Sequence, residues 1–179
     1  MSIHTRRIRT TSPRTAVVVG NPKPRSRTLA AATTLARGLT DTEPDIVLDL
    51  AELGGSLFDQ SAHEVSEAVE SVAGADVVVV ASPTYKAAYT GLLKAFMDRF
   101  PGGGLDGVLA APLMLGAGPG HALAVETTLR PVLSELGATV PAGGLYVIDA
   151  QYDEPAVYQP WLDRARPVFD ALLAAKAVV

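Results

Sequence analysis

Residues Asp76–Ala81 read Asp-Val-Val-Val-Val-Ala, and this run of four valines indicates how the rest of the chain folds. A strand that is apolar without alternation is typical of one buried on both faces, as in a parallel sheet. Four further short runs, rich in apolar and β-branched residues, are predicted to be strands of the same sheet. They are Thr15–Gly20, Asp45–Leu50, Val108–Leu115 and Gly144–Asp149.

The segments between and after these strands have the apolar spacing of amphipathic helices. Three core-facing stripes are predicted: Leu92, Leu93, Phe96, Met97 and Phe100; Val125, Leu129, Val132, Leu133 and Leu136; and Trp161, Ala165, Val168, Phe169 and Leu172. Pro131 and Pro167 fall inside two of these helices, so we expect kinks or breaks there. Strands that alternate with helices predict an α/β fold with right-handed βαβ crossovers.

Length and composition fit a single domain. The chain has 179 residues, of which 48% are hydrophobic, and two domains would be cramped in that length. The first fourteen positions hold four arginines and no acidic residue. We therefore expect residues 1–14 to be a disordered basic extension, with binding to an anionic surface as the alternative, and residues 15–179 to form the domain.

The residue types also exclude several classes of function. The chain has no cysteine, which excludes disulfides and thiolate chemistry. His4, His63 and His121 lack the spacing of metal ligands, so no metal site is expected. Beyond residue 14 the acidic side chains outnumber the basic ones, which argues against binding of nucleic acid. No apolar run could span a bilayer and no signal peptide is recognisable, so we expect no membrane association and a cytoplasmic location.

Open parallel sheets bind ligands beyond the carboxyl ends of their strands, where the strand order reverses. The loop after the first predicted strand reads Gly20-Asn21-Pro22-Lys23-Pro24-Arg25-Ser26-Arg27-Thr28 and leads into a helix. Hydroxyls, free amides and three basic side chains at a helix N-terminus predict an anion site, although Ser26 or Thr28 could also cap the helix. The loop has neither the Gly-Lys-Ser/Thr ending of a P-loop nor Gly-x-Gly-x-x-Gly.

Two further loops are predicted at the same edge of the sheet. The loop from Ala81 to Gly91 carries Tyr85, which could lie beside a planar ring, or could pack against neighbouring helices or a subunit. The loop from Gly116 to His121 is rich in glycine, which lets backbone approach a flat ligand closely; a flexible turn is the alternative. His121 alone is more typical of a helix cap or a structural histidine than of a catalyst.

These motifs together resemble the NAD(P)H-dependent FMN reductases of the flavodoxin-like superfamily, and most of all the reductase components of two-component alkanesulfonate monooxygenases. The resemblance extends from about Thr15 to Asp153. It is carried by Gly20-Asn21-Pro22 with Ser26-Arg27-Thr28, by Ser82-Pro83-Thr84-Tyr85-Lys86-Ala87-Ala88-Tyr89-Thr90-Gly91-Leu92-Leu93-Lys94, by Pro112-Leu113 through Gly116-Ala117 to His121, by Leu129-Arg130-Pro131-Val132-Leu133, and by Asp149-Ala150-Gln151.

The resemblance implies a flavodoxin-like three-layer sandwich with a parallel sheet in 2-1-3-4-5 order. It also implies which residues bind FMN: Ser26, Arg27 and Thr28 the phosphate; Pro83, Thr84, Tyr85 and Lys86 the ring and ribityl chain; Gly116 and Ala117 the isoalloxazine. Asn21, Arg25, Gly118 and His121 complete the expected cofactor site. Three positions depart from the family: Asn21 replaces a usual serine, Ala117 a usual glycine, and Thr127 lies where some of these reductases carry an aromatic residue in a distorted helix.

The chemistry implied is hydride transfer from C4 of NADPH or NADH to N5 of the flavin, with the reduced flavin supplied to a flavin-dependent monooxygenase. No paired carboxylates or nucleophile–base arrangement accompanies the three loops, so no catalytic acid or base is assigned. The alternatives are a quinone or azo-dye reductase on the same fold, a non-enzymatic flavodoxin-like carrier, and a partner-binding module with a vestigial site.

A homodimer or homotetramer is also expected. The predicted helix from Tyr89 to Phe100 carries more apolar residues than one covering face requires, although the whole stripe could be core. The resemblance points to twofold assembly, and Tyr89 is the candidate residue at the subunit boundary.

Overall fold

The computed structural model describes residues 12–177, and within them five parallel strands form one sheet in the order β2-β1-β3-β4-β5. The strands are β1 (Thr15–Val19), β2 (Ile46–Asp49), β3 (Val77–Pro83), β4 (Leu109–Gly116) and β5 (Leu145–Ile148). The predicted fold class and all five predicted strands are confirmed. The largest difference in bounds is at β3, which continues for two residues past Ala81, because Ser82 and Pro83 pair with Met114 and Leu115. Pro83 therefore belongs to the strand and not to the loop.

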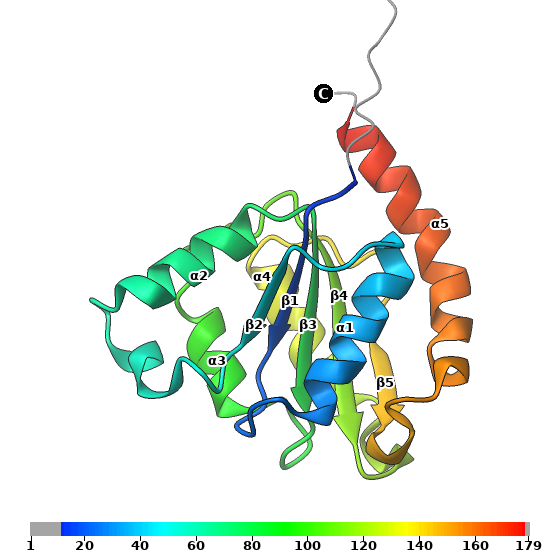
Figure 1. Cartoon of the computed structure of the whole chain (residues 1–179), viewed down its shortest axis with the longest axis horizontal. Coiled ribbons are helices and arrows are strands. Elements are labelled where there is room, and N and C mark those ends of the chain that lie inside the picture. Colours follow the sequence, from blue (N-terminus) through cyan, green and yellow to red (C-terminus); the bar gives the residue numbers. More distant parts are fainter. Residues whose placement is uncertain (1–11, 178–179) are drawn as a thin grey trace, which may run out of the picture.

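Helices cover both faces of the sheet and make a three-layer sandwich (Figure 1). On one face lie α1 (Arg27–Thr40) and α5 (Gln159–Lys176), and on the other lie α2 (His63–Ala73), α3 (Gly91–Met97) and α4 (Arg130–Glu135). The chain runs from β1 outward to β2 and then returns to β3 on the other side of β1. The order of the strands thus reverses between β1 and β3, where open sheets of this kind bind ligands.

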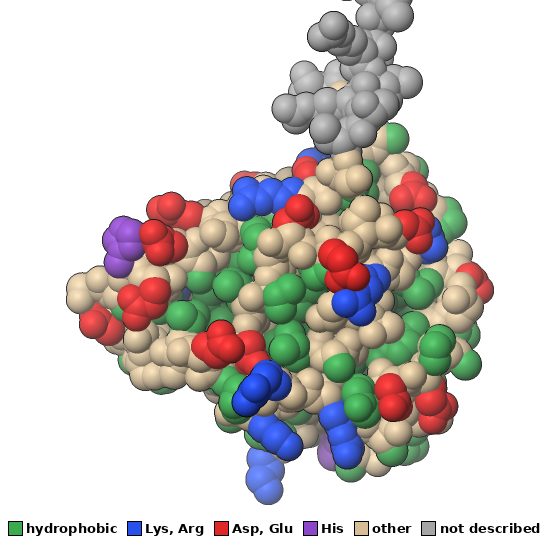
Figure 2. All heavy atoms as spheres, in the orientation of Figure 1, with side chains coloured by type: hydrophobic (Ala, Val, Ile, Leu, Met, Phe, Trp, Pro, Cys, Tyr) green, Lys and Arg blue, Asp and Glu red, His purple; other side chains and the backbone are tan. Residues whose placement is uncertain are grey.

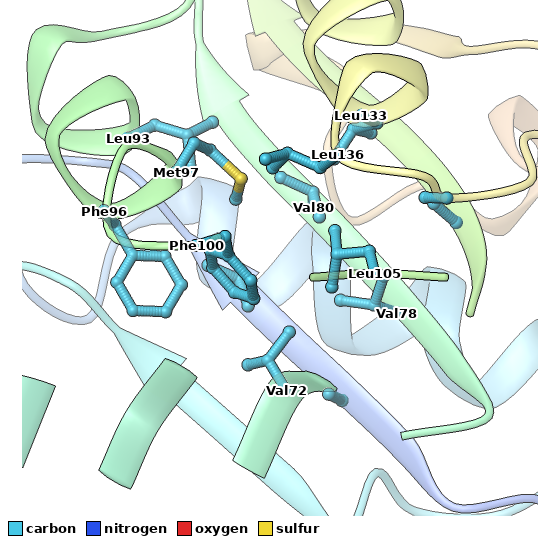
Figure 3. Close-up of a cluster of buried hydrophobic side chains, with 14 of the residues drawn as sticks. Val72, Val78, Val80, Leu93, Phe96, Met97, Phe100, Leu105, Leu133 and Leu136 are labelled. Carbon is cyan, nitrogen blue, oxygen red and sulfur yellow. The ribbon is translucent and has the colours of Figure 1, made fainter. Parts of the chain in front are cut away.

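The sheet separates two hydrophobic cores, because alternate residues of each strand point to opposite faces. Val78 and Val80 of β3 face α2, α3 and α4, while Val77 and Val79 face α1 and α5. Figure 3 shows the first of these cores, in which Phe96 and Phe100 meet edge to face with ring centroids 5.4 Å apart. All four valines of the run are fully buried, which confirms that this strand is covered on both faces.

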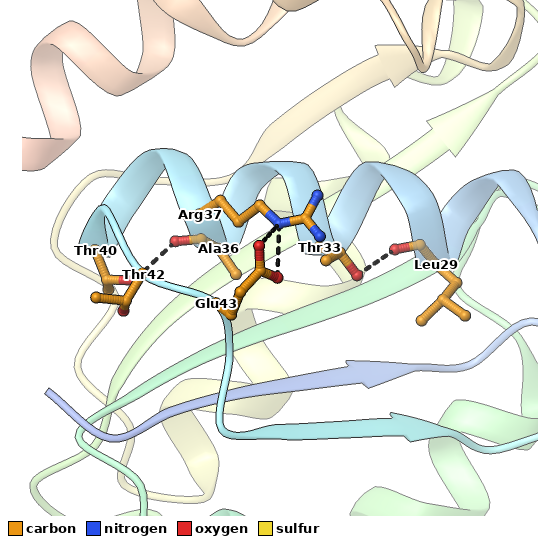
Figure 4. A network of polar contacts seen from close by, with 7 residues as sticks. All are labelled: Leu29, Thr33, Ala36, Arg37, Thr40, Thr42 and Glu43. Atoms are coloured by element: carbon orange, nitrogen blue, oxygen red, sulfur yellow. Dashed lines mark hydrogen bonds and ion pairs between the residues drawn. The ribbon is translucent and has the colours of Figure 1, made fainter.

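Polar side chains of α1 form hydrogen bonds within the helix and an ion pair near its C-terminal end. Thr33 donates to the carbonyl of Leu29, and Arg37 pairs with Glu43 in the segment that leads to β2, with Nε and Oε1 2.7 Å apart (Figure 4). The buried face of α1 is rich in alanine, so the helix lies close to the sheet. This fixes the position of the N-terminus of α1 relative to the carboxyl ends of the strands.

The two prolines differ from one another in their effect. The stretch predicted as one helix around Pro131 is a π-helix, Val125–Leu129, that continues directly into α4, and Pro131 is the second residue of α4. The break expected at Pro167 is wrong, because α5 runs through it without interruption. Pro167 is exposed, so the carbonyl that loses its helical partner faces water.

Three smaller expectations also need correction or lie outside the described residues. Val168 was predicted to face the core but is 40% exposed, because the buried face of α5 is formed by other residues, namely Trp161, Leu162, Ala165 and Phe169. The helix predicted from Tyr89 to Phe100 spans only Gly91–Met97. Of the basic extension, residues 1–11 lie outside the described part, and in residues 12–177 no helix is long and apolar enough to cross a membrane.

Candidate functional site

Three loops meet at the carboxyl edge of the sheet and are joined by hydrogen bonds. The Thr90 hydroxyl, at the N-cap of α3, donates to the carbonyl of Gly20 in the first loop, with the two oxygens 2.5 Å apart. The amide of Thr84 in the second loop donates to the carbonyl of Leu115 at the end of β4, with N and O 2.6 Å apart. Gly20 itself must lack a side chain, since a Cβ there would lie 2.3 Å from the Cβ of Leu93.

The first loop is held in shape by its own side chains. Asn21 donates from Nδ2 to the hydroxyl of Thr28 at 3.0 Å and accepts the amide of Lys23 at 2.9 Å. Ser26 is the N-cap of α1, and its hydroxyl accepts the amide of Leu29. Asn21, Ser26 and Thr28 are all buried. The asparagine that replaces the family's usual serine at position 21 therefore shapes the loop through its two hydrogen bonds. The N-terminus of α1 opens here, where the first amides have no partner within the helix.

The loop also concentrates positive charge around that helix end. The side chains of Lys23, Arg25 and Arg27 are exposed, and Figure 2 shows Lys and Arg side chains gathered at the end of the molecule where the strands finish. Arg25 adopts a left-handed φ of 52°, and its amide donates to the buried carboxylate of Asp49, with N and Oδ2 2.7 Å apart. Asp49 ends β2 and was not predicted as a site residue; its position at the end of a strand is the signal that could have found it.

Arg27 turns away from the loop and reaches the end of β5. Its Nη1 lies 2.6 Å from Oδ2 of Asp149, and its guanidinium carbon lies 5.6 Å from the ring centroid of Tyr152. The carbonyl of Tyr152 accepts a hydrogen bond from the hydroxyl of Tyr158, which is buried. Burial, together with the charge of nearby Asp153, raises the pKa of Tyr158 to about 12, so this hydroxyl stays a donor. The predicted phosphate arginine is therefore tied to a segment 122 residues away.

The second loop makes a tight turn with an unusual backbone. Tyr85 and Ala88 exchange backbone hydrogen bonds, and the two residues between them, Lys86 and Ala87, both have positive φ, 51° and 65°. Residues other than glycine rarely adopt this conformation, and such strain clusters at functional sites. The turn leaves Tyr85 53% exposed at the carboxyl edge of the sheet. The predicted residues of this loop are thus brought to the same edge as the first loop.

The third loop is positioned by a tyrosine that sequence reasoning missed. Tyr146, on β5, donates from its hydroxyl to the carbonyl of Gly118 at 2.9 Å. A Cβ at Gly116 would lie 1.8 Å from that hydroxyl oxygen and 3.4 Å from Oγ1 of Thr84. The Oγ1 of Thr84 is buried and has no hydrogen-bond partner among the described residues. The absence of a side chain at Gly116 thus leaves room for Tyr146 and Thr84 beneath the loop. In the loop itself, Ala117 and His121 are exposed.

The π-helix that follows the third loop is fixed to the loop before β5. Glu126 accepts the amide of Gly144 and pairs with Arg130 at 2.8 Å. Partial burial raises the pKa of Glu126, but the Gly144 amide and the Arg130 guanidinium outweigh it, so the pKa lies below its usual value. The π-helix includes Thr127, whose hydroxyl donates to the carbonyl of Leu123 at 3.0 Å. Thr127 departs from the aromatic residue that some similar reductases carry in a distorted helix, yet the helix here is also distorted. π-Helices occur often at functional sites.

The residues brought together here fit FMN. A helix N-terminus with three basic side chains suits a phosphate. The buried Thr84 hydroxyl has no hydrogen-bond partner within the part of the chain that the structure describes, and Gly116 lies under a loop. Both suit a polar, planar ring that approaches the backbone closely. Within residues 12–177 no group of three His, Asp or Glu side chains could hold a metal ion.

Comparison with known proteins identifies the family. Residues 13–153 match the family model described as NADPH-dependent FMN reductase. The chain belongs to the NADPH-dependent FMN reductase family. Within it, the chain is 32% identical over 179 aligned positions to an FMN reductase (NADPH) of Pseudomonas aeruginosa, which covers 89% of this chain and 94% of that one.

Two further comparisons define how far the likeness to other FMN reductases extends. An FMN reductase (NADPH) of Escherichia coli is 43% identical over 82 residues, but this chain spans only 43% of its length. The crystal structure of an NADH:FMN oxidoreductase in its apo form has a TM-score of 0.78 and 29% identity, with 90% of this chain and 88% of that chain covered. The flavodoxin-like fold of this FMN reductase family member is thereby confirmed.

The contact between Gly116 and Tyr146 predicts the effect of a small substitution in this FMN reductase family member. Gly116→Ala should lower the free energy of unfolding by about 1–3 kcal/mol, because the new methyl group must displace Tyr146 and break its hydrogen bond to Gly118. Gly118→Ala is the matched control, since a Cβ there meets nothing within 4 Å. Urea unfolding of both variants measures the difference. Equal stabilities would contradict the packing described for Gly116.

Proposed function

We propose that this protein is an NAD(P)H:FMN oxidoreductase that transfers a hydride from a reduced nicotinamide nucleotide to FMN. Membership of the family supports this proposal, and so does the similarity to relatives named FMN reductase (NADPH) and NADH:FMN oxidoreductase. The observation that carries it is the joining of three loops at one edge of the sheet, with a basic helix N-terminus at one side and a close-packed glycine at the other.

Each loop has a distinct task in this proposal. Ser26, Arg27 and Thr28 hold the FMN phosphate at the N-terminus of α1, and Asn21 and Arg25 support that loop. When bound, FMN supplies the hydride acceptor N5 and NAD(P)H supplies the donor C4. The protein accelerates the reaction by holding the two rings in contact, which needs no protein acid or base.

The ring side of the site is assigned to the second and third loops. Pro83, Thr84, Tyr85 and Lys86 face the ring and ribityl chain, and the unpartnered Thr84 hydroxyl is available to a polar atom of the flavin. Gly116, Ala117, Gly118 and His121 flank the isoalloxazine, with Tyr146 fixing the loop from below. We also propose that the reduced flavin is delivered to a flavin-dependent monooxygenase.

Steady-state assays test the proposed activity. Purified protein should oxidise NADPH or NADH when FMN is present, followed by the loss of absorbance of the reduced nicotinamide. The same assay with quinones and azo dyes tests the closest alternative, in which the reduced flavin passes electrons to those acceptors. FMN binding without turnover with either nucleotide would contradict the proposal and favour a flavodoxin-like carrier, and failure to bind FMN would favour a partner-binding module.

The phosphate assignment predicts the effect of removing Arg27. Arg27→Ala should weaken FMN binding by about 1.5–3 kcal/mol, because a charge-assisted hydrogen bond to the phosphate is lost. Arg37→Ala is the matched control: this exposed arginine lies near the other end of α1 and pairs with Glu43 (Figure 4). Titration of flavin fluorescence measures both affinities. An unchanged affinity in the Arg27 variant would reassign that residue to a structural link with Asp149.

A homodimer or homotetramer is part of the same proposal. The core of the subunit buries four of the apolar residues in the predicted helix: Leu93, Phe96, Met97 and Phe100. The apolar residues left over for a contact between subunits are therefore reduced to Tyr89 and Leu92, which are half-buried. Elsewhere on the surface, two large apolar side chains are exposed by about three quarters: Phe58 at 75% and Leu123 at 73%. In this proposal these two side chains are candidates for a contact between subunits.

Sedimentation of the purified protein at micromolar concentration should therefore give the mass of a dimer or a tetramer. A monomer, with or without FMN, would contradict the proposed assembly. Tyr89→Ala should weaken both association and FMN binding if this residue lies at the boundary between subunits. An intact dimer with full FMN affinity in that variant would remove Tyr89 from the proposed role and leave the assembly standing.

A further inference from the structure

Arg27 differs from the other basic residues of the first loop in having a carboxylate partner. Lys23, Arg25 and Arg27 are all exposed, but within residues 12–177 only Arg27 of these three forms an ion pair. Its partner, Asp149, is the first residue after β5, at the same carboxyl edge of the sheet. One of the three basic side chains beside the N-terminus of α1 is thus already bound to a carboxylate of the protein itself.

The ion pair uses only part of the binding capacity of Arg27. Nη1 alone of the guanidinium is bonded to Asp149, through the single oxygen Oδ2 at 2.6 Å, although a guanidinium has five N–H donors in a planar fork. The ring of Tyr152 lies against the same guanidinium at 5.6 Å. Tyr152 is fixed in turn through its carbonyl by the buried Tyr158. The position of Arg27 therefore depends on an aromatic ring as well as on the carboxylate.

A phosphate bound at the N-terminus of α1 must share Arg27 with Asp149 or displace it. Two anions that share one cation repel each other across a few ångströms, and this repulsion reduces the affinity for the second anion. The side chains of Arg27 and Asp149 are 59% and 42% exposed, so water screens their attraction and the pair contributes little order. The Tyr152 ring helps to hold the Arg27 guanidinium in place and adds no negative charge. The net effect of Asp149 on a bound phosphate should therefore be repulsive.

We propose that Asp149 acts as an internal competitor for the FMN phosphate at Arg27, which weakens FMN binding and speeds FMN release. The inference rests on the proposed function, because it concerns the phosphate of the same FMN. A protein that hands reduced flavin to another protein must release it, and a carboxylate that returns to Arg27 as the phosphate leaves favours release. Asp149 is in this sense a residue that sets whether FMN behaves as a substrate or as a tightly held cofactor.

Asp149→Asn tests the proposal, because asparagine keeps the size and the acceptor oxygen of aspartate but removes its charge. FMN should bind about three- to tenfold more tightly to this variant, and its dissociation rate should fall by a similar factor. Riboflavin, which lacks the phosphate, should bind with unchanged affinity. Asp41→Asn is the matched control: it removes the charge of another exposed aspartate paired with an arginine, Arg166, at the far end of α1. Its affinities for both flavins should equal those of the wild type.

A second variant separates competition from a general structural effect. In the Arg27→Ala background, Asp149→Asn should strengthen FMN binding less than it does in the wild type, because competition for the guanidinium is gone and only the direct repulsion between the carboxylate and the phosphate remains. Weaker or unchanged FMN binding by the single Asp149 variant would overturn the inference, and weaker binding would make Asp149 a residue that positions Arg27. A wild-type protein that binds neither FMN nor riboflavin would overturn the proposed function, and this inference with it.

Discussion

The hydrogen bond from the Thr90 hydroxyl to the Gly20 carbonyl is the constraint on which the site depends. It joins the end of β1 to the N-terminus of α3 in a buried position, where a carbonyl without a partner would be costly. Gly20 permits the approach because it has no side chain to meet Leu93. The first and second loops are thus held together at the point where the strand order reverses. A ligand that touches both loops meets a surface already in place.

Around this junction the protein places its charges asymmetrically. The first loop is basic, with a helix N-terminus and exposed Lys23 and Arg25, whereas Thr84, Gly116 and Tyr146, which lie together between the second and third loops, carry no charge. Two carboxylates contact the first loop, and they have different effects on it. Asp49 is buried and binds a backbone amide, so it shapes the loop, while Asp149 is partly exposed and binds Arg27. In the site that we propose, affinity for the FMN phosphate is therefore set by both attraction and competition.

The likeness to other FMN reductases and the local geometry support one another at the π-helix. An aromatic residue accompanies the distorted helix in some reductases that the sequence resembles, yet here the distortion forms around Thr127. Threonine hydroxyls at 127 and 128 bond to carbonyls one turn earlier, and Glu126 ties the helix to Gly144. Side chains that bond to the backbone and to a neighbouring loop can therefore maintain this geometry without an aromatic ring.

The sequence by itself determined the parallel sheet and the three loops, because Val77–Val80 can be buried only between two layers and the motifs at the strand ends are local. The order of the strands was implied by the resemblance to a known family, and the structure confirms it. It did not determine that α5 continues through Pro167, which depends on that residue facing water. Only the tertiary structure decided the roles of Asp49, Tyr146 and Asp149. Each lies far along the chain from the loop that it touches, and a contact between distant strands leaves no local pattern in the sequence.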